Sequence, residues 1–446
     1  MSEFVPVYVP AGVPTFHMES ARDRFLCSQK LCREICPAFV CPEEMLLSVD
    51  AVREFLAGVK PDLVVFQNLT FANAAYMSEV LRVYDGPIVL WTLREPVIDG
   101  GRLRLNSLTG AYSAAHTLRN FGDRPFEYIF GAPEEEEVKE QLAAAVEAAK
   151  VKKALRSLRM MAVGHTPQGF GFGRALDAEL MSTFGAELEA IEARELIDRA
   201  KSLSEEDCAG ALTETACATC GFEKTPEVNR IGHARLLKAY TDYVKEHRIG
   251  ALASRCWPDF FTAYGTPVCT VLSQLNDLGV AAACEADIYG ALSMWIGMQL
   301  SGSAVFFGDP VSLDEKENTL TFWHCGAAAP SLARKDTGAV VGVHPNRKIG
   351  PAMDFGCEAF EAATIFRIGR EPDGSFRFFL AEGEALDKPK QFTGTSLVIR
   401  TDADVRYLVE ESVREGFEPH FAVMKGRHAE TLRILAGMYG FAVCEF

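Results

Sequence analysis

Four ionisable side chains each adjoin a short apolar run, where an uncompensated charge would lie against a hydrophobic core. Three of them follow such a run and the fourth precedes one; they are Glu285, Asp309, His324 and His420. A carboxylate or an imidazole in that position costs stability unless a partner or a metal ion takes it up. The fold of this chain therefore has to bring compensating groups to these four positions.

Two carboxylates and one or two imidazoles are a suitable donor set for a divalent ion of hard to borderline character, such as Mn²⁺. This combination indicates a metalloenzyme. Each residue also has an ordinary structural interpretation when it is taken singly. Glu285 precedes a helical pattern, where the helix dipole favours a carboxylate, and Asp309 precedes a proline that suits a turn. A single histidine beside an apolar run is more often a core or edge residue than a ligand.

The length and charge of the chain limit its organisation and its partners. With 446 residues it is too long for one hydrophobic core, so two or three domains are expected. The net charge of −16 disfavours nucleic acid and anionic membranes as partners. The sequence has no apolar run of about 18 residues and no basic, apolar leader, so we expect neither a membrane span nor a signal peptide, and predict a cytoplasmic location.

Two groups of closely spaced cysteines occur among the 13 in the chain. They are Cys27, Cys32, Cys36 and Cys41, and the pair Cys217 and Cys220. The first group fits no common zinc or iron–sulfur spacing, and the C-x-x-C pair lacks a second pair. Cysteines in a large chain without a signal peptide are usually free thiols, so we expect free thiols in both groups.

Residues 1–155 alternate strand-like and helix-like segments. Short β-rich runs at 63–66, 88–91 and 126–130 are separated by helical patterns, and an Ala/Glu/Lys-rich helix follows at about 134–156. This alternation predicts a parallel α/β sheet. We assign the segment to an N-terminal α/β domain on the substrate side of the molecule.

A second α/β domain is expected over residues 156–317. Its strand-like runs lie at 160–164, 186–191 and 249–253, and its long helical pattern lies at about 230–246. We expect it to close with two strands that end at Glu285 and Asp309, so that this domain carries both candidate carboxylates.

Residues 318–446 have a different pattern, in which short strands follow one another with few helices between them. The strand-like runs lie at 319–323, 339–343, 363–368, 376–380 and 396–400. Consecutive strands of this kind predict an antiparallel sheet or barrel. The predicted fold class is therefore α/β: two parallel-sheet α/β domains are followed by a β-rich, barrel-like C-terminal domain that carries the site histidines.

Polar residues follow several of the predicted parallel strands. The loops at the carboxyl ends of such strands converge, and binding sites concentrate there. Glu285, Asp309, Arg94 and Arg255 are all expected at strand ends. The pattern predicts a crevice lined by residues of both α/β domains.

Several motifs resemble the L-fucose isomerase and L-arabinose isomerase superfamily, especially its fucose-isomerase-like branch. The motifs are CWPDF at 256–260, ACEADIYGAL at 283–292, GD at 308–309, FWHCG at 322–326 and HFAVMKGRH at 420–428, of which the segment from Glu285 to Asp309 and the His420 motif are specific. NSLTGA at 106–111 and VGHTPQGF at 163–170 resemble the family more loosely. The likeness covers most of the chain.

The resemblance implies an aldose–ketose isomerase that uses Mn²⁺ or another divalent cation and assembles as a homo-oligomer with shared active sites. Position by position, Glu285 and Asp309 match the catalytic, metal-binding carboxylates, and His420 matches the C-terminal metal histidine. His324 matches a further site histidine of the arabinose-type enzymes. The substrate contacts implied in this way are His324, Arg255, Arg94, Asn106 and Trp257.

Such a reaction moves a carbonyl between C1 and C2 of a sugar through an enediol. A positioned carboxylate can take the proton from one carbon and return it to the other, and a divalent ion can stabilise the negative charge that develops on the two oxygens. Glu285 and Asp309 are the residues expected in these roles. A hydride shift between the two carbons is the alternative mechanism.

Loop arginines suit an anionic sugar, because a guanidinium fork matches a planar or tetrahedral anion. The candidates are Arg94, Arg102, Arg104 and Arg255. A hexose with a C6 sulfonate, sulfoquinovose (6-deoxy-6-sulfoglucose), is the candidate substrate, and sulfofructose would be its product. A neutral 6-deoxyaldose or a pentose, of the L-fucose, D-arabinose or L-arabinose type, is the alternative.

Two readings from other classes fit less well. A non-catalytic sugar-binding protein is expected to lose an acidic ligand, whereas both carboxylates are present. A nucleotide-dependent enzyme is disfavoured because the chain has no G-x-x-x-x-G-K-[ST] motif, and the glycine-rich segment 169–173 lacks the Rossmann spacing. We expect no nucleotide cofactor.

Overall fold

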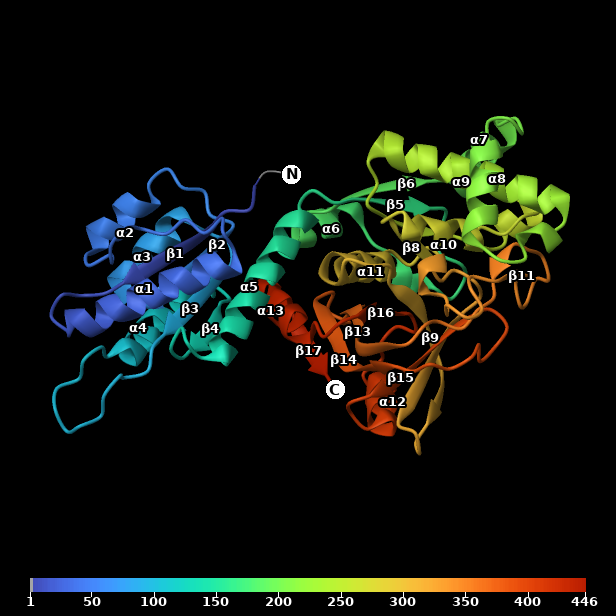
Figure 1. The fold of residues 1–446 in the computed structure, drawn as a ribbon. Helices are drawn as coiled ribbons and strands as arrows, with labels where there is room; N and C mark the ends of the chain where they lie inside the picture. Colours follow the sequence, from blue (N-terminus) through green and yellow to red (C-terminus); the bar gives the residue numbers. More distant parts are fainter. Residues whose placement is uncertain (1–2) are drawn as a thin grey trace. The chain divides into compact units, whose positions relative to one another are not determined.

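The computed structural model describes residues 3–446 and contains two compact units, each with its own hydrophobic core. One unit is formed by the chain up to Ala154 together with Glu430–Ala442. The other is formed by Leu155–Ala429 together with Val443–Phe446. Figure 1 shows the elements of both units.

The first unit is built on a four-stranded parallel sheet in the order β1-β2-β3-β4. Its strands are β1 (Pro6–Ala11), β2 (Leu63–Asn68), β3 (Ile88–Thr92) and β4 (Glu127–Phe130). Its helices are α1 (Met18–Ile35), α2 (Val49–Leu56), α3 (Ala74–Val83), α4 (Ser107–Asn120), α5 (Glu136–Leu155) and α13 (Ala429–Tyr439). Strands β1 to β3 are buried along their whole length, which is typical of parallel strands covered by helices on both faces.

The second unit contains another four-stranded parallel sheet, in the order β6-β5-β7-β8. Its strands are β5 (Arg159–Val163), β6 (Glu187–Ile191), β7 (Ala251–Ser254) and β8 (Ala281–Cys284). The longer helices are α6 (Asp177–Phe184), α7 (Ala193–Ser202), α8 (Ala209–Ala218), α9 (Glu227–His247), α10 (Cys269–Asp277) and α11 (Ile288–Ser301). Short helical turns are η1 (Gly171–Gly173), η2 (Phe222–Lys224), η3 (Phe260–Tyr264) and η4 (Pro330–Leu332).

Six further strands of this unit form a closed antiparallel barrel. They are β9 (Phe306–Asp314), β10 (Thr319–His324), β13 (Phe360–Arg370), β14 (Phe376–Ala385), β15 (Thr395–Thr401) and β16 (Phe421–Lys425). Because β13 pairs with both β14 and β16, the order β13-β16-β9-β10-β15-β14 returns to its start. The remaining elements are the ribbon of β11 (Val341–Gly342) and β12 (Ala352–Met353), helix α12 (Val405–Arg414) and β17 (Ala442–Glu445), which pairs with β14.

Helix α11 connects the parallel sheet to the barrel. It packs against β7 and β8 on one side and against β13 and β16 on the other. Every residue from Ile288 to Met298 is buried and most are apolar, as expected for a helix covered on all sides over that length. Gly290 permits close approach, because a Cβ atom there would lie 2.5 Å from the Phe307 ring. Among the described residues, no helix is both long and apolar enough to cross a membrane.

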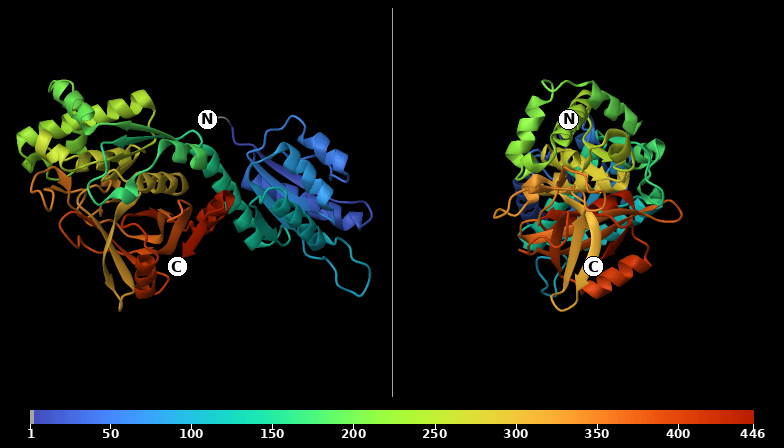
Figure 2. Two further views of the ribbon diagram at one scale, coloured as in Figure 1. Left: turned by 180° about the vertical axis from the view of Figure 1, so that it is seen from behind. Right: turned by 90° about the vertical axis from the view of Figure 1, so that its right-hand side faces the viewer.

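The predicted fold class is confirmed, since parallel α/β sheets are followed by a largely antiparallel β-rich region. One placement is wrong. Asp309 does not end a strand of the parallel sheet; it lies within β9, which continues to Asp314 as one arm of a barrel hairpin. The apolar run stops there because residues 310–314 are exposed, although the strand itself goes on. Figure 2 shows this hairpin from two further directions.

Candidate active site

Glu285 leaves the carboxyl end of β8 in an unusual backbone conformation. Both Glu285 and Ala286 have a φ of +58°, in the left-handed region that residues other than glycine rarely occupy. Such conformations persist only where the surrounding structure fixes them, and they cluster at functional sites. The turn directs the Glu285 carboxylate away from the sheet and places Asp287 at the start of α11.

Asp287 is the most heavily bonded carboxylate of the site, and it is fully buried. It caps α11 by accepting the Gly290 backbone N–H at 2.9 Å. The Arg367 guanidinium donates to its two oxygens at 2.6 and 3.1 Å, and His420 Nδ1 lies 2.9 Å from Oδ2. Burial alone would raise the pKa of Asp287, but the positive charges of Arg367 and His420 outweigh it and hold the pKa below its ordinary value.

His420 precedes β16 and presents its second ring nitrogen to the other two carboxylates. Nε2 lies 3.0 Å from Glu285 Oε2 and 3.4 Å from Asp309 Oδ1. Burial lowers the pKa of this imidazole, but the bonds to Asp287 and Glu285 dominate and raise the pKa to about 10. One buried ring therefore joins three carboxylates.

His324 and Asp309 reach the same place from neighbouring barrel strands. Trp323 of β10 pairs with Asp309 of β9, so His324 at the end of β10 lies beside it. One donor atom each from Glu285, His324 and His420 lies within 4.8 Å of the others. Burial raises the pKa of Asp309, and the charges of the two imidazoles only partly offset this effect. The structure thus brings together Glu285, Asp309, His324 and His420, and their roles stay predictions.

Aromatic rings surround His420. The ring centroids of Phe307, Phe172 and Phe170 lie 5.0, 5.6 and 6.2 Å from its own. Phe170 and Phe172 come from the glycine-rich segment, and a Cβ atom at Gly173 would lie only 2.8 Å from the Asp287 backbone. The glycines of this segment therefore allow close packing, and the rings limit the access of water to the histidine.

Trp257 and Arg255 lie beside Glu285, on the loop after β7. The Trp257 indole N–H donates to Glu285 Oε1 at 3.4 Å. Arg255 Nε lies 2.9 Å from an Asp259 carboxylate oxygen and donates to the Trp257 carbonyl at 3.1 Å. The Arg347 guanidinium covers the Trp257 ring, with its central carbon 5.5 Å from the ring centroid. Among the described residues, Arg347 is exposed and makes no ion pair, whereas Arg255 is already neutralised.

Two predicted substrate contacts belong to the other unit. Arg94 there pairs with Glu135 at 3.0 Å and covers the Phe130 ring. Asn106 has a φ of +54° immediately before α4, and its side chain accepts the Thr109 hydroxyl at 2.7 Å. Their roles in binding substrate stay predictions.

A divalent cation fits the donor set at His420. The bond from Nδ1 to the Asp287 carboxylate fixes the ring and assigns the hydrogen to that nitrogen, which is the usual arrangement behind a metal-binding histidine. Because the pKa of this imidazole is raised to about 10, Nε2 carries a proton at neutral pH, and a cation would displace that proton to bind in the space shared with Glu285 and Asp309. Glu285, Asp309 and His420 are the residues that could hold the ion, and His324 is within reach of the same point.

The sequence interpretation missed three residues of this region: Asp287, Arg367 and Arg347. The first two have a sequence signal. Asp287 stands immediately before a wholly apolar helix, and Arg367 interrupts the apolar strand β13. Each is a buried charge that requires a partner, and each is the partner of the other. Arg347 lies in an irregular loop, where no periodic pattern identifies it.

The Asp287–Arg367 pair predicts a large effect on stability. Replacing Arg367 by methionine removes the guanidinium but keeps an apolar stem, so Asp287 is left buried with only His420 as a charged partner. The free energy of unfolding, measured in urea, should fall by about 3–5 kcal/mol. Arg400→Met, which breaks the exposed pair with Glu384, should cost less than about 1 kcal/mol. Similar losses in both variants would contradict this account.

Curated relatives match nearly the whole chain. A sulfoquinovose isomerase of Clostridium sp. (strain MSTE9) is 59% identical over 438 residues, which cover 98% of each chain. A sulfoquinovose isomerase of Priestia megaterium (strain ATCC 12872 / QMB1551) is 38% identical, again over 98% of each chain, and one of Alkalicoccus urumqiensis is 39% identical over 91% of each. No protein-family model matches the chain. Identity of this extent shows that the chain is a sugar isomerase and belongs to the sulfoquinovose isomerase family.

Proposed function

We propose that this enzyme converts sulfoquinovose, a hexose with a C6 sulfonate, into sulfofructose. The observation that carries the proposal is the meeting of Glu285 and Asp309 at His420 Nε2, in a chain whose full-length relatives are sulfoquinovose isomerases. Two carboxylates at one point supply the acid and the base that an aldose–ketose conversion requires. The broader likeness to fucose and arabinose isomerases stays a prediction.

The proposed reaction is a proton transfer between adjacent carbons of the open-chain sugar. Either Glu285 or Asp309 removes the proton from C2, and a proton is delivered to C1. At the same time the hydroxyl group at O2 loses its proton and O1 gains a proton. The raised pKa of Asp309, caused by burial, suits a group that holds a proton during part of the cycle. The rings of Phe170, Phe172 and Phe307 keep water from this exchange.

The proposal includes Mn²⁺ or a similar divalent cation, held by Glu285, Asp309 and His420. Asp287 supports this role because it orients the His420 ring from the opposite side. When bound, the cation would supply positive charge to the two sugar oxygens between which the carbonyl moves. His324, on the same side of the site, would contact the substrate.

We infer that the sulfonate is recognised by Arg347. Its guanidinium has no carboxylate partner among the described residues and lies over Trp257, which in turn donates to Glu285. A free guanidinium separated from the carboxylates by one indole ring suits a sugar whose reactive end and charged end are four carbons apart. Arg255 lies nearer to Glu285, but its charge is balanced by Asp259. Arg102 and Arg104, in the other unit, and Arg94, which pairs with Glu135, are weaker candidates.

Removing either carboxylate should abolish isomerisation while the protein stays folded. Glu285→Gln and Asp309→Asn keep the shape of each side chain and remove its charge and basicity. General acid–base catalysis contributes roughly 10²–10⁴-fold, so kcat should fall at least that far in either variant. If a variant keeps more than about a tenth of wild-type kcat, its residue is neither the acid–base group nor an essential ligand. A circular dichroism spectrum identical to that of wild type is the control for folding.

Chelation should remove activity and leave the unit folded. The proposed ligands come from separate parts of a large folded core, so the structure should survive loss of the cation, unlike that of a zinc finger. We expect exhaustive EDTA treatment to abolish turnover and added Mn²⁺ to restore it. Full activity after EDTA would contradict the participation of a metal ion.

Arg347→Met should weaken the use of the sulfonated sugar alone. Loss of a charge-assisted bond costs about 1.5–3 kcal/mol, so kcat/KM for sulfoquinovose should fall roughly ten- to a hundred-fold. The kcat/KM for glucose should not fall. Arg255→Met is the matched variant, and a selective loss there but not in Arg347→Met would assign the sulfonate to Arg255. Equal kcat/KM for the two sugars in wild type would reject sulfoquinovose and favour a neutral 6-deoxyaldose or pentose.

A further inference from the structure

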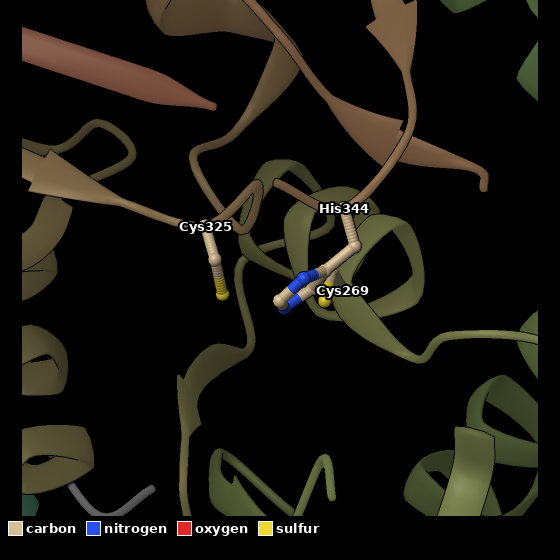
Figure 3. A group of neighbouring side chains, drawn as sticks. All are labelled: Cys269, Cys325 and His344. Carbon is tan, nitrogen blue, oxygen red and sulfur yellow. The ribbon is translucent and has the colours of Figure 1, made fainter. Parts of the chain in front are cut away.

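A second cluster of metal-ligating side chains lies in the same unit. Cys269, Cys325 and His344 place one donor atom each within 4.8 Å of one another. Figure 3 shows the side chains of these residues directed into one space from three separate segments. Cys269 begins α10, Cys325 follows β10, and His344 lies on the segment that joins β11 to β12. None of the three belongs to the proposed catalytic set.

A third thiol lies beside this cluster, at the end of β8. The thiol of Cys284 contacts that of Cys325, which also contacts Cys269. Within 4.8 Å, however, Cys284 forms a donor group with Cys325 and His324, and not with Cys269 and His344. The cluster itself therefore offers two sulfur donors and one imidazole.

The His344 ring is held by its own loop. Its Nδ1 atom accepts the backbone N–H groups of Asn346 and Arg347 at 3.2 and 3.3 Å, and the residue is buried. Nε2 is the other ring nitrogen. Because Nδ1 accepts, a neutral ring carries its hydrogen on Nε2. Binding of a cation would move that hydrogen to Nδ1 and give up two long hydrogen bonds, a small cost against the bonds to thiolates.

We propose that Cys269, Cys325 and His344 bind a zinc ion. Thiolate and imidazole donors are the set that zinc prefers, whereas the oxygen-rich set at Glu285 and Asp309 suits a harder ion. Three protein ligands would leave the fourth position of the tetrahedral shell to a water molecule. Cys325 Sγ lies 3.4 Å from His324 Nδ1, so this site adjoins the proposed catalytic one without using its carboxylates. The inference goes beyond the proposed function and does not depend on it.

The site would fix the segment that carries Arg347. Residues 325–359 connect β10 to β13 and contain only the short elements η4, β11 and β12. Zinc would tie this segment to α10 through Cys269 and to the end of β10 through Cys325. Since His344 precedes Arg347 by three residues in the same short loop, an ion on His344 would limit the positions that Arg347 can take.

Cobalt substitution tests the proposal directly. The full-length protein, purified in reductant and stripped of metal, is titrated with Co²⁺ and then with Zn²⁺. We expect one cobalt per chain to give the thiolate-to-cobalt charge-transfer absorption of a tetrahedral sulfur site, and zinc to abolish it. Absence of this absorption in the wild-type protein would overturn the proposal, whatever the activity of the enzyme.

Variants locate the ion. Cys269→Ala and His344→Ala should each lose most of the charge-transfer absorption, so a folding failure in one leaves the other as a test. Cys357→Ala, a buried cysteine in the barrel core, should retain it. Glu285→Gln should also retain it, which distinguishes this site from the proposed catalytic one. Retained absorption in both folded ligand variants, or a Cys269–Cys325 disulfide without zinc in the native protein, would contradict the proposal.

Discussion

The bidentate pair between Asp287 and Arg367 is the interaction on which the rest of the site depends. Both side chains are completely buried, and a buried charge is tolerated only when a partner with good geometry compensates for its lost hydration. Asp287 begins the helix that packs on the parallel sheet, and Arg367 lies on a barrel strand. The pair therefore fixes α11 against the barrel, because any shift would leave two charges unpaired in an apolar interior.

This constraint determines how His420 can act. Asp287 already accepts from Arg367 and from the helix N-terminus, and its contact with His420 Nδ1 holds the imidazole in a single orientation. Nε2 is thereby directed at Glu285 and Asp309. The left-handed backbone at Glu285 is part of the same arrangement, since the capped helix begins two residues later. Strain in the turn and burial of the ion pair are both offset by the packing of the barrel on α11.

The sequence predicted more of the fold than of the site's geometry. Apolar runs located most strands, although not β1, β12 or β17, because parallel strands and barrel strands bury continuous or alternating apolar residues. The same reasoning misplaced Asp309, since the exposed extension 310–314 begins with a proline and lacks a continuous apolar run. The sequence interpretation assigned the four ionisable residues to one site, but it did not include Asp287 or Arg367. These two residues form an ion pair although they are 80 residues apart in the sequence. Arg347 could not be predicted from the sequence, because tertiary contacts alone position a residue in an irregular loop.

Three cysteines that are adjacent in sequence to site residues form a second layer of side chains beside the carboxylate cluster. Cys284 precedes Glu285, Cys325 follows His324, and Cys256 precedes Trp257, and the thiols of Cys256, Cys284 and Cys325 contact one another in series. At each place one residue faces the carboxylate cluster and its neighbour faces the sulfur cluster. The two layers share three backbone segments, so a change in volume or charge among the sulfur atoms moves the groups that carry the chemistry. The buried thiols therefore help to position the site residues, in addition to the Asp287–Arg367 ion pair.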